Sequence, residues 1–356
     1  MFFTIIIAFF SLIALIIIHE LGHFILAKKF GVKVEEFGIG YPPRVLGKKI
    51  GETVYSLNLW PFGAFVKIHG EEGGIEDYRS FIGKPIWQRV AIVLGGVVSF
   101  WIVAVILLSV VAGIWGLPTA VSDEDNHNLI GPKIQITQIA DHSPAQAAGL
   151  RAGDIIVGFE KVKDVQEFID AHQGEEIVLT LKRGSQVFNE KIIPRVAPPE
   201  GEGAIGIGLV RTAFKSYTWY EAPGQGVLTA WQLSLDIVNG WVLGLKSAFG
   251  LIKLPAGMKM EMMGPLGIFE LLREYSALGI NYFLFLISLI ALALALANIL
   301  PIPALDGGKL FFLLIEGVRG KPINYKVEQK ITATFFVLLI MLMVFVTVKF
   351  DIPRLF

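Results

Sequence analysis

The sequence predicts a polytopic α-helical membrane protein with about four transmembrane helices, a membrane-associated β-hairpin and a separate α/β domain. Three observations lead to this fold class. The 356 residues are 54% hydrophobic and only 17% charged, and the mean hydropathy of +0.62 is high for a soluble chain. The apolar residues are concentrated in four blocks, and a central stretch alternates apolar and polar residues between Gly and Pro turns.

Each apolar block is long enough to cross a bilayer. A hydrocarbon core of ~30 Å needs ~18–20 residues of helix at ~1.5 Å per residue. The blocks are Phe2–Ile18, Ala91–Trp115, Tyr282–Leu300 and Ile331–Val348. The alternative for the first block is a cleaved signal peptide, which is disfavoured because no basic residue precedes it and no small-residue cleavage site follows it.

Basic residues predict the orientation. The segment between the first two blocks carries Lys28, Lys29, Lys33, Arg44, Lys48, Lys49, Lys67, Arg79, Lys84 and Arg89, and the one between the last two carries Arg319, Lys321, Lys326 and Lys330. By the positive-inside rule both segments are cytoplasmic, which places both termini and the long middle segment outside.

A β-hairpin is predicted at about 51–70, within a first membrane domain of residues 1–118. Residues alternate from Val54 to Leu59, and a second short run, Ala64–Ile68, follows a turn at Pro61 and Gly63. Its apolar residues favour a hairpin that dips into the membrane interface. An ordinary soluble hairpin is the alternative.

The middle segment has two parts. Residues 129–211 read as a globular α/β module, with strands at Lys133–Ile139, Ile177–Lys182 and Val187–Ile193 and a short helix at Val165–Ala171. Residues 217–280 read as amphipathic helices in the outer interface, with a fifth membrane helix over Val227–Ile252 as the alternative. The last two membrane helices form the domain 281–356.

Composition limits the chemistry. Lys plus Arg equals Asp plus Glu at 31 each, so net charge favours no nucleic-acid partner. Cysteine is absent, so a metal ion must be bound by His and carboxylate side chains.

The first apolar block ends in His19-Glu20-Leu21-Gly22-His23. Residues four apart point the same way on a helix, so both imidazoles can bind one zinc ion, with Glu20 beside them to take a proton from water. Ionisable residues within a membrane helix are costly, which favours a functional role. The alternative is that these residues lie beyond the membrane in water.

Zinc needs a third protein ligand. His127, His142 and His172 lie on the opposite side of the membrane, and His69 is interpreted as a solvated loop residue. The best candidate is Asp306, because it follows Pro301 and Pro303 at the cytoplasmic end of the third block, at the depth of the two histidines. Its alternative role is a helix N-cap.

The paired motifs HELGH and Asn298-Ile-Leu-Pro-Ile-Pro-Ala-Leu-Asp306-Gly-Gly resemble those of the site-2 protease family, in its bacterial branch. The resemblance implies an intramembrane zinc metalloprotease of the bacterial plasma membrane, multi-pass, with its active site near the cytoplasmic face. It implies Glu20 as catalytic base, His19, His23 and Asp306 as Zn²⁺ ligands, and Asn298, Pro301 and Pro303 at the substrate. It also implies that the 51–70 element, which contains Gly63, presents the substrate as an added strand. Substrates would be single-span membrane proteins or peptides, such as anti-sigma factors or signal-peptide remnants, cut by regulated intramembrane proteolysis.

The outer module resembles a PDZ domain of the bacterial, permuted kind. Ser143–Ala145 and Ala148–Ile156 match its most recognisable stretch, and Ala204–Ile207 is placed where such domains receive a peptide carboxylate. Glu160-Lys161 replaces the usual Asn-Gly turn, and only one such module is present. The module is therefore interpreted as a steric filter, with binding of a peptide or a substrate ectodomain as the alternative.

Two other functions are alternatives. A metal or proton transporter also places His, Glu and Asp in membrane helices, but the sequence has no inverted repeat. A peptide-binding membrane scaffold would not need Glu20 between two ligand histidines.

Overall fold

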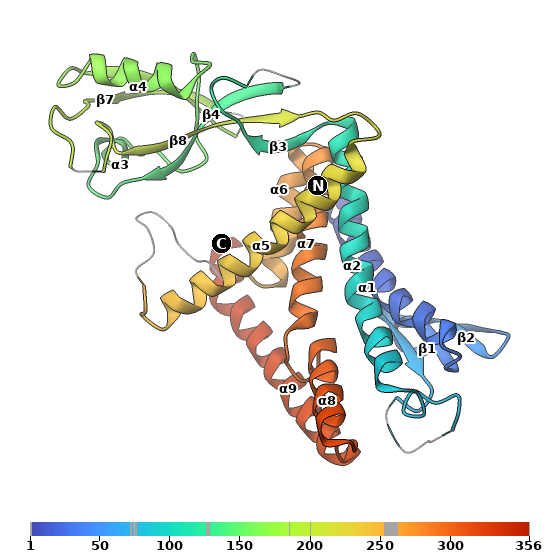
Figure 1. Ribbon diagram of the computed structural model, residues 1–356. Helices are drawn as coiled ribbons and strands as arrows, with labels where there is room; N and C mark the ends of the chain where they lie inside the picture. The colour runs from blue at the N-terminus through green and yellow to red at the C-terminus, as the bar shows by residue number, and fades with distance from the viewer. Residues whose placement is uncertain are drawn as a thin grey trace. The chain divides into compact units, whose positions relative to one another are not determined.

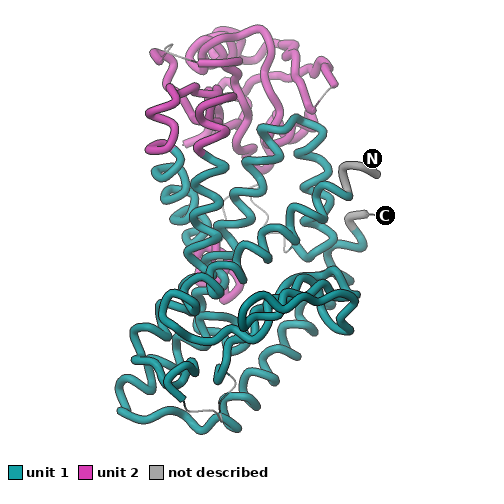
Figure 2. The backbone as a smooth tube through the Cα atoms, turned by 90° about the vertical axis from the view of Figure 1, so that its right-hand side faces the viewer, with its two compact units in different colours: residues 1–108, 226–239, 261–356 teal, residues 109–225, 240–260 magenta. Residues whose placement is uncertain are grey.

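The computed structural model describes residues 2–71, 73, 77–125, 129–184, 186–199, 201–252 and 263–355. The chain divides into two compact units, coloured separately in Figure 2. Unit 1 holds residues 1–108, 226–239 and 261–356, and unit 2 holds residues 109–225 and 240–260.

The described residues form mainly long helices and two β-sheets (Figure 1). The helices are α1 (Phe2–Lys29), α2 (Ile86–Ile114), α3 (Pro144–Ala147), α4 (Val162–Ala171), α5 (Ala222–Ala248), α6 (Pro265–Leu278), α7 (Ile280–Ile299), α8 (Asp306–Arg319), α9 (Tyr325–Val346), the π-helical turn η1 (Thr347–Asp351) and α10 (Ile352–Leu355). The strands are β1 (Val34–Ile50), β2 (Thr53–Ile68), β3 (Leu117–Ala120), β4 (Leu129–Ile139), β5 (Ile155–Ile156), β6 (Ile177–Arg183), β7 (Gln186–Ile192) and β8 (Ile207–Lys215).

Within the described part of the chain, four helices are long and apolar enough to cross a membrane. They are Ile6–Lys29, Ile86–Ile114, Ile280–Ile299 and Tyr325–Asp351. Each of these segments overlaps one of the four predicted apolar blocks, and the first extends beyond its block to Lys29. The 27-residue helix α5, which covers most of the alternative fifth span, is not one of the four. The predicted interfacial segment 217–280 contains α5 and α6, and its residues 253–262 lie outside the described part.

Helices α1 and α2 approach each other at glycines. A Cβ atom on Gly95 would lie 2.6 Å from the carbonyl oxygen of Gly22, and a Cβ on Gly22 would clash with the backbone of Gly95 in return. The absence of side chains at both positions lets the two backbones touch, as small residues do between membrane helices. This close crossing lies one residue before His23 on α1.

The predicted break after the third span separates α7, which ends at Ile299, from α8, which begins at Asp306. The loop between them folds tightly against the first turn of α8, since a Cβ on Gly308 would lie 2.6 Å from the Cα of Pro303. Ala304 has a φ of 92°, a region that residues with a Cβ rarely adopt and that costs of order 1–3 kcal/mol. Packing of the loop on α8 therefore maintains a strained backbone directly before Leu305 and Asp306.

The hairpin prediction at 51–70 is wrong in its pairing. Residues 53–68 form β2, whose partner is β1, and the tight turn of the hairpin is at Gly51. Both elements bend: residues 36–39 pair on one side with 54–57 and on the other with 64–67, and residues 44–50 pair with 53–58. The spatial order is therefore 44–50, 53–58, 36–39, 64–68. The charged and proline-rich residues of β1 concealed its strand character from the pattern of alternation.

Unit 2 is built on a six-stranded sheet in the order β3-β8-β4-β5-β6-β7. Its core contains Ile134, Ile136, Ile156, Leu179 and Leu181, with Val165 and Ile169 of α4 packed onto them. Strands β4, β6 and β7 and helix α4 occupy the segments where strands and a helix were predicted. The sheet extends beyond the predicted limits of 129–211, because β3 pairs with the last residues of β8, up to Lys215.

Polar contacts complete unit 2. Asp154 is buried and receives both Nε and Nη2 of Arg183 at 2.7 Å. Burial raises the pKa of this carboxyl, but the ion pair outweighs burial and leaves the pKa of Asp154 below its usual value. Asp123 accepts hydrogen bonds at 2.9 Å from the backbone N–H groups of Val162 and Lys163. This distant cap explains why α4 begins three residues before the predicted start at Val165.

Candidate metal centre

Two histidines and one aspartate of unit 1 converge on a single point. The distance between His19 Nε2 and His23 Nε2 is 3.3 Å, and each of these atoms lies 3.4 Å from Asp306 Oδ2. These side chains form a group able to hold a metal ion, the one such group of three or more found among the described residues. The structure thus brings together the three side chains predicted as ligands.

Helix α1 aims both imidazoles at this point because they are four residues apart. The backbone carbonyl of Ile92 accepts a hydrogen bond of 2.9 Å from His23 Nδ1, which fixes the tautomer and leaves Nε2 with a free lone pair. The ring of His19 stacks on Phe100 of α2, with 4.6 Å between ring centroids. Helix α2 therefore orients both histidines.

Asp306 is the first residue of α8, not its N-cap, since Leu305 occupies the cap position. Its Oδ2 atom is buried and, among the described residues, accepts no hydrogen bond. A buried carboxylate oxygen without a donor is costly. An oxygen in this position, close to two imidazole nitrogens, is suited to bind a metal cation.

The three atoms fit a zinc ion. Ligands at ~2.0–2.1 Å from tetrahedral zinc are separated from one another by about 3.3–3.4 Å, and the three separations here are 3.3, 3.4 and 3.4 Å. They form one triangular face of a tetrahedron. The fourth vertex is left for water or substrate, which is the arrangement of catalytic rather than structural zinc sites.

Glu20 lies beside the ligands and faces the bent sheet. It follows His19 on α1 and is half-buried, and the backbone N–H of Val66, in segment 64–68 of β2, interacts with its carboxylate. In the order of segments given above, 64–68 is at one end of the sheet. The carboxylate is therefore next to an edge strand.

The residues expected at the substrate lie on α7, in the loop before α8 and on β2. Asn298 is half-buried near the end of α7, where its amide donates a hydrogen bond of 3.0 Å to the carbonyl of Leu294. Pro301 is exposed and Pro303 is half-buried in the loop before Asp306. Gly63 is buried in the bend of β2 with a φ of 147°, and a Cβ there would lie 3.0 Å from the ring of Tyr41.

The interpretation of His69 as a solvated residue is wrong. Its side chain is only 13% exposed and bridges two carboxylates, with Nδ1 2.8 Å from Glu35 and Nε2 3.0 Å from Asp77. These hydrogen bonds raise the pKa of His69 and hold the pKa values of Glu35 and Asp77 below their usual range. His172 bonds to the carbonyl of Phe168, and His127 lies outside the described residues.

Four residues of α2 that were not predicted from the sequence contribute to the centre. Gly95 and Gly96 permit the close approach of α2, since a Cβ on Gly96 would meet both ligand histidines. Ile92 contributes its carbonyl and Phe100 its ring. A Gly-Gly pair within a run of large apolar residues is the one signal in the sequence that could have pointed to this helix.

Comparisons with known proteins agree on one family. The model of peptidase family M50 matches residues 7–342. A candidate zinc metalloprotease of Clostridium perfringens (strain 13) is 32% identical over 352 residues, 97% of each chain, and one of Clostridium acetobutylicum is 32% identical over 98% of this chain and 97% of its own. The regulator of sigma-W protease RasP of Bacillus subtilis is 28% identical, with both chains covered in full.

Solved structures match as well. The PDZ domain of an SdrC-like protein from Listeria monocytogenes is 21% identical and covers 24% of this chain and 92% of its own, with a TM-score of 0.20.

Proposed function

This chain belongs to peptidase family M50, the site-2 protease family of zinc metalloproteases, and on that premise we propose that it cuts single-span membrane proteins or peptides within the bilayer. The observation that carries the proposal is the triangle formed by His19 Nε2, His23 Nε2 and Asp306 Oδ2. The three residues belong to α1 and α8, so the centre lies on a membrane helix and on the helix that follows the third span.

His19, His23 and Asp306 are the residues that would hold the ion. A zinc ion held there supplies a Lewis acid that polarises a carbonyl group and increases the acidity of water. The chain contributes the geometry. The Ile92 carbonyl and the Phe100 ring fix the two imidazoles, and the loop before α8 fixes the carboxylate.

Glu20 is the proposed general base. It lies next to a ligand on the same helix, outside the triangle, so its carboxylate is available to accept a proton from the attacking water and to deliver it to the leaving amine. The backbone N–H of Val66 lies near this carboxylate. Proton transfer by a positioned carboxylate typically contributes ~10²–10⁴-fold to the rate.

The substrate is proposed to bind in extended form. A helical carbonyl is hydrogen-bonded and shielded, so the peptide must unwind before hydrolysis. Segment 64–68 of β2 pairs with 36–39 on one side, and an extended peptide added on its other side would pass Val66 and hence Glu20. Asn298 and the Pro301–Pro303 loop, adjacent to Asp306, are proposed to hold the peptide from the opposite direction.

The basic segments support an orientation with both termini and unit 2 outside the bacterial plasma membrane and the metal centre near the cytoplasmic face. The sheet of unit 2 is proposed to be PDZ-like, acting as a steric filter against large ectodomains. Anti-sigma factors and signal-peptide remnants are the proposed substrate classes, and the regulator of sigma-W protease among the relatives supports the first.

The base assignment is tested with Glu20→Gln in the purified full-length protein. We expect unchanged zinc content by elemental mass spectrometry and loss of cleavage of a single-span reporter, at least ~10²-fold. Glu274→Gln, on the exposed surface of α6, is the matched control and should cleave normally. Cleavage retained by Glu20→Gln would refute its role.

The ligand set is tested separately with Asp306→Ala. Removing one of three ligands should lower the zinc content well below one ion per chain, together with activity. Full zinc occupancy in this variant would remove Asp306 from the ligand set.

A further inference from the structure

The bent β1–β2 sheet has one polar and one apolar face. Across the strands, Leu46 pairs with Leu57 and Lys48 with Tyr55, while Phe37 and Ile39 pair with Tyr55 and Leu57 on their other side. Directly paired residues share a face, and alternate residues of a strand do so as well. Leu46, Lys48, Tyr55, Leu57, Phe37 and Ile39 therefore lie on one face.

Side chains of the opposite face form hydrogen bonds with one another and with the strand backbone. Glu36 accepts hydrogen bonds from Arg44 at 2.5 Å and from Ser56 at 2.6 Å, and Asn58 donates to Ser56 and to the carbonyl of Gly40.

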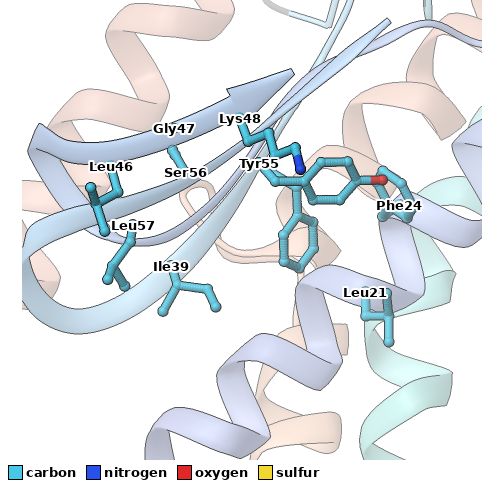
Figure 3. A pocket seen from close by; sticks show the side chains of 10 residues that line it. Leu21, Phe24, Ile39, Leu46, Gly47, Lys48, Tyr55, Ser56 and Leu57 are labelled. Atoms are coloured by element: carbon cyan, nitrogen blue, oxygen red, sulfur yellow. The ribbon is translucent and has the colours of Figure 1, made fainter. Parts of the chain in front are cut away.

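The apolar face borders a cavity of about 530 Å³ beside α1 (Figure 3). Phe24 of α1, Phe37 and Tyr55 form a continuous aromatic surface, with centroid separations of 5.5, 6.1 and 6.3 Å. Leu46 and Leu57 remain 64% and 48% exposed. The volume is within the ~300–1,000 Å³ range of small-molecule sites, and the lining is apolar enough for a hydrocarbon chain.

One cation lines the same cavity. Lys48 is exposed, and no ion pair or side-chain hydrogen bond of its ammonium group is found among the described residues. Three other basic residues in this part of the fold are paired: Lys28 and Arg79 both contact Glu52, and Arg44 contacts Glu36. Lys49 is also exposed, but by alternation it points to the polar face. Lys48 therefore supplies an uncompensated positive charge next to an apolar surface.

The depth of the cavity matches a lipid headgroup. Phe24 precedes Lys28 and Lys29, where the first span ends, by about 6–8 Å along the helix axis. Basic residues at the end of a span lie at headgroup level. The acyl region of the bilayer thus begins at the aromatic surface.

We propose that this cavity binds an anionic phospholipid, with an acyl chain against Phe24, Phe37 and Tyr55 and the phosphate at Lys48. A peptide is a poorer occupant, because a sheet face offers no backbone partners and the N–H and C=O groups of a peptide would stay unpaired. An acyl chain has no such groups. The site is separate from the metal triangle and from segment 64–68, and it does not depend on the hydrolytic function.

The test compares lipids with identical acyl chains. Full-length protein is exchanged into nanodiscs of equal phosphatidylglycerol and phosphatidylcholine, released, and measured by native mass spectrometry for retained lipid. A basic residue near an anionic lipid contributes enough for about a fivefold preference. We expect this preference for phosphatidylglycerol in the wild type and a ratio near one in Lys48→Ala.

Lys49→Ala is the matched control, because Lys49 is equally exposed but, by alternation, points to the polar face. It should keep the preference. Leu57→Asp should lose both lipids while zinc content stays unchanged. Equal losses in Lys48→Ala and Lys49→Ala would reduce the effect to general surface charge and overturn the proposal. A photoreactive residue at position 57 that crosslinks a single-span substrate instead of lipid would also overturn it.

Discussion

At the scale of single residues, Gly96 sets how close α2 can come to the metal ligands. A Cβ on this residue would lie against His23 Nε2 and against the His19 ring, 2.7 Å from its Nδ1. Gly96→Ala should therefore displace at least one imidazole and lower bound zinc severalfold, without adding charge or removing a ligand. Elemental mass spectrometry of the purified protein measures the loss.

The control for Gly96→Ala is Gly317→Ala on α8. A Cβ there meets only Ile86 at 3.8 Å, which is ordinary van der Waals contact, so zinc content should stay at the wild-type level. Equal zinc in both variants would show that α2 does not confine the histidines.

His69 makes the stability of one part of the fold depend on pH. Its pKa is raised by hydrogen bonds to Glu35 and Asp77, so the stability it contributes is fully present below its unfolded pKa of ~6.5 and is lost as pH rises through the higher folded pKa. The pKa of Glu35 is lowered, so its contribution is lost in acid. The network should be strongest between about pH 5 and 6.5.

Hydrogen exchange measures this window. The amide of Phe81 donates to the carbonyl of His69, so its protection, corrected for intrinsic rates, should fall between pH 6.5 and 9. His69→Gln should remove that pH dependence, whereas His172→Gln in unit 2 should leave it intact. Protection of Phe81 that is constant across this range would contradict the assignment.

At the scale of elements, α2 and α8 are joined by a buried ion pair. Arg89 donates both Nη atoms to Glu316 at 3.0 and 2.6 Å, and the side chains are 8% and 14% exposed. Lys309, three residues after Asp306, forms a second ion pair with Glu71 after the end of β2. Ion pairs thus hold α8, which carries Asp306, to α2 and to the residue Glu71 that follows β2.

Removing one partner of the Arg89–Glu316 ion pair should lower the stability of the protein more than replacing both partners. Glu316→Ala leaves the Arg89 guanidinium buried without a counter-ion, which typically costs ~3–5 kcal/mol, whereas an apolar pair can be nearly neutral. Thermal unfolding in detergent should therefore rank wild type and Arg89→Met/Glu316→Leu above Glu316→Ala. A double variant less stable than the single one would indicate that the charges themselves are required.

At the scale of the whole molecule, unit 2 has its own hydrophobic core. The strand pairing in its sheet allows a test of which residues the folded domain needs. A soluble fragment of residues 115–217 keeps β3 and all of β8, whereas a fragment of 129–211, as predicted from the sequence, loses β3 and the pairing of Phe214 with Ile130. The longer fragment should melt cooperatively and at least about 5 °C higher. Circular dichroism against temperature measures both melting temperatures. Equal values would exclude a contribution of β3 to the stability of the domain.

The features that depend on a short stretch of sequence could be predicted. The apolar blocks, the HELGH spacing and the Pro-interrupted approach to Asp306 are all encoded within short windows. The features that depend on contacts between distant segments could not be predicted. The partner of residues 53–68 is a strand with two prolines and several charges, the cap of α4 comes from Asp123, and the significance of Gly95-Gly96 appears only when α2 crosses α1.

The convergence of Asp306 with the two histidines has a consequence for electroneutrality. Asp306 and Glu20 bring two carboxyl groups close to one point, an excess of two formal negative charges when both are ionised and the imidazoles are neutral. One divalent cation cancels this excess, so the loaded protein carries no net charge there. Assembly of α1 against α8 and uptake of the ion should therefore occur as one coupled event, with chelators loosening the contact between these helices as well as stopping hydrolysis.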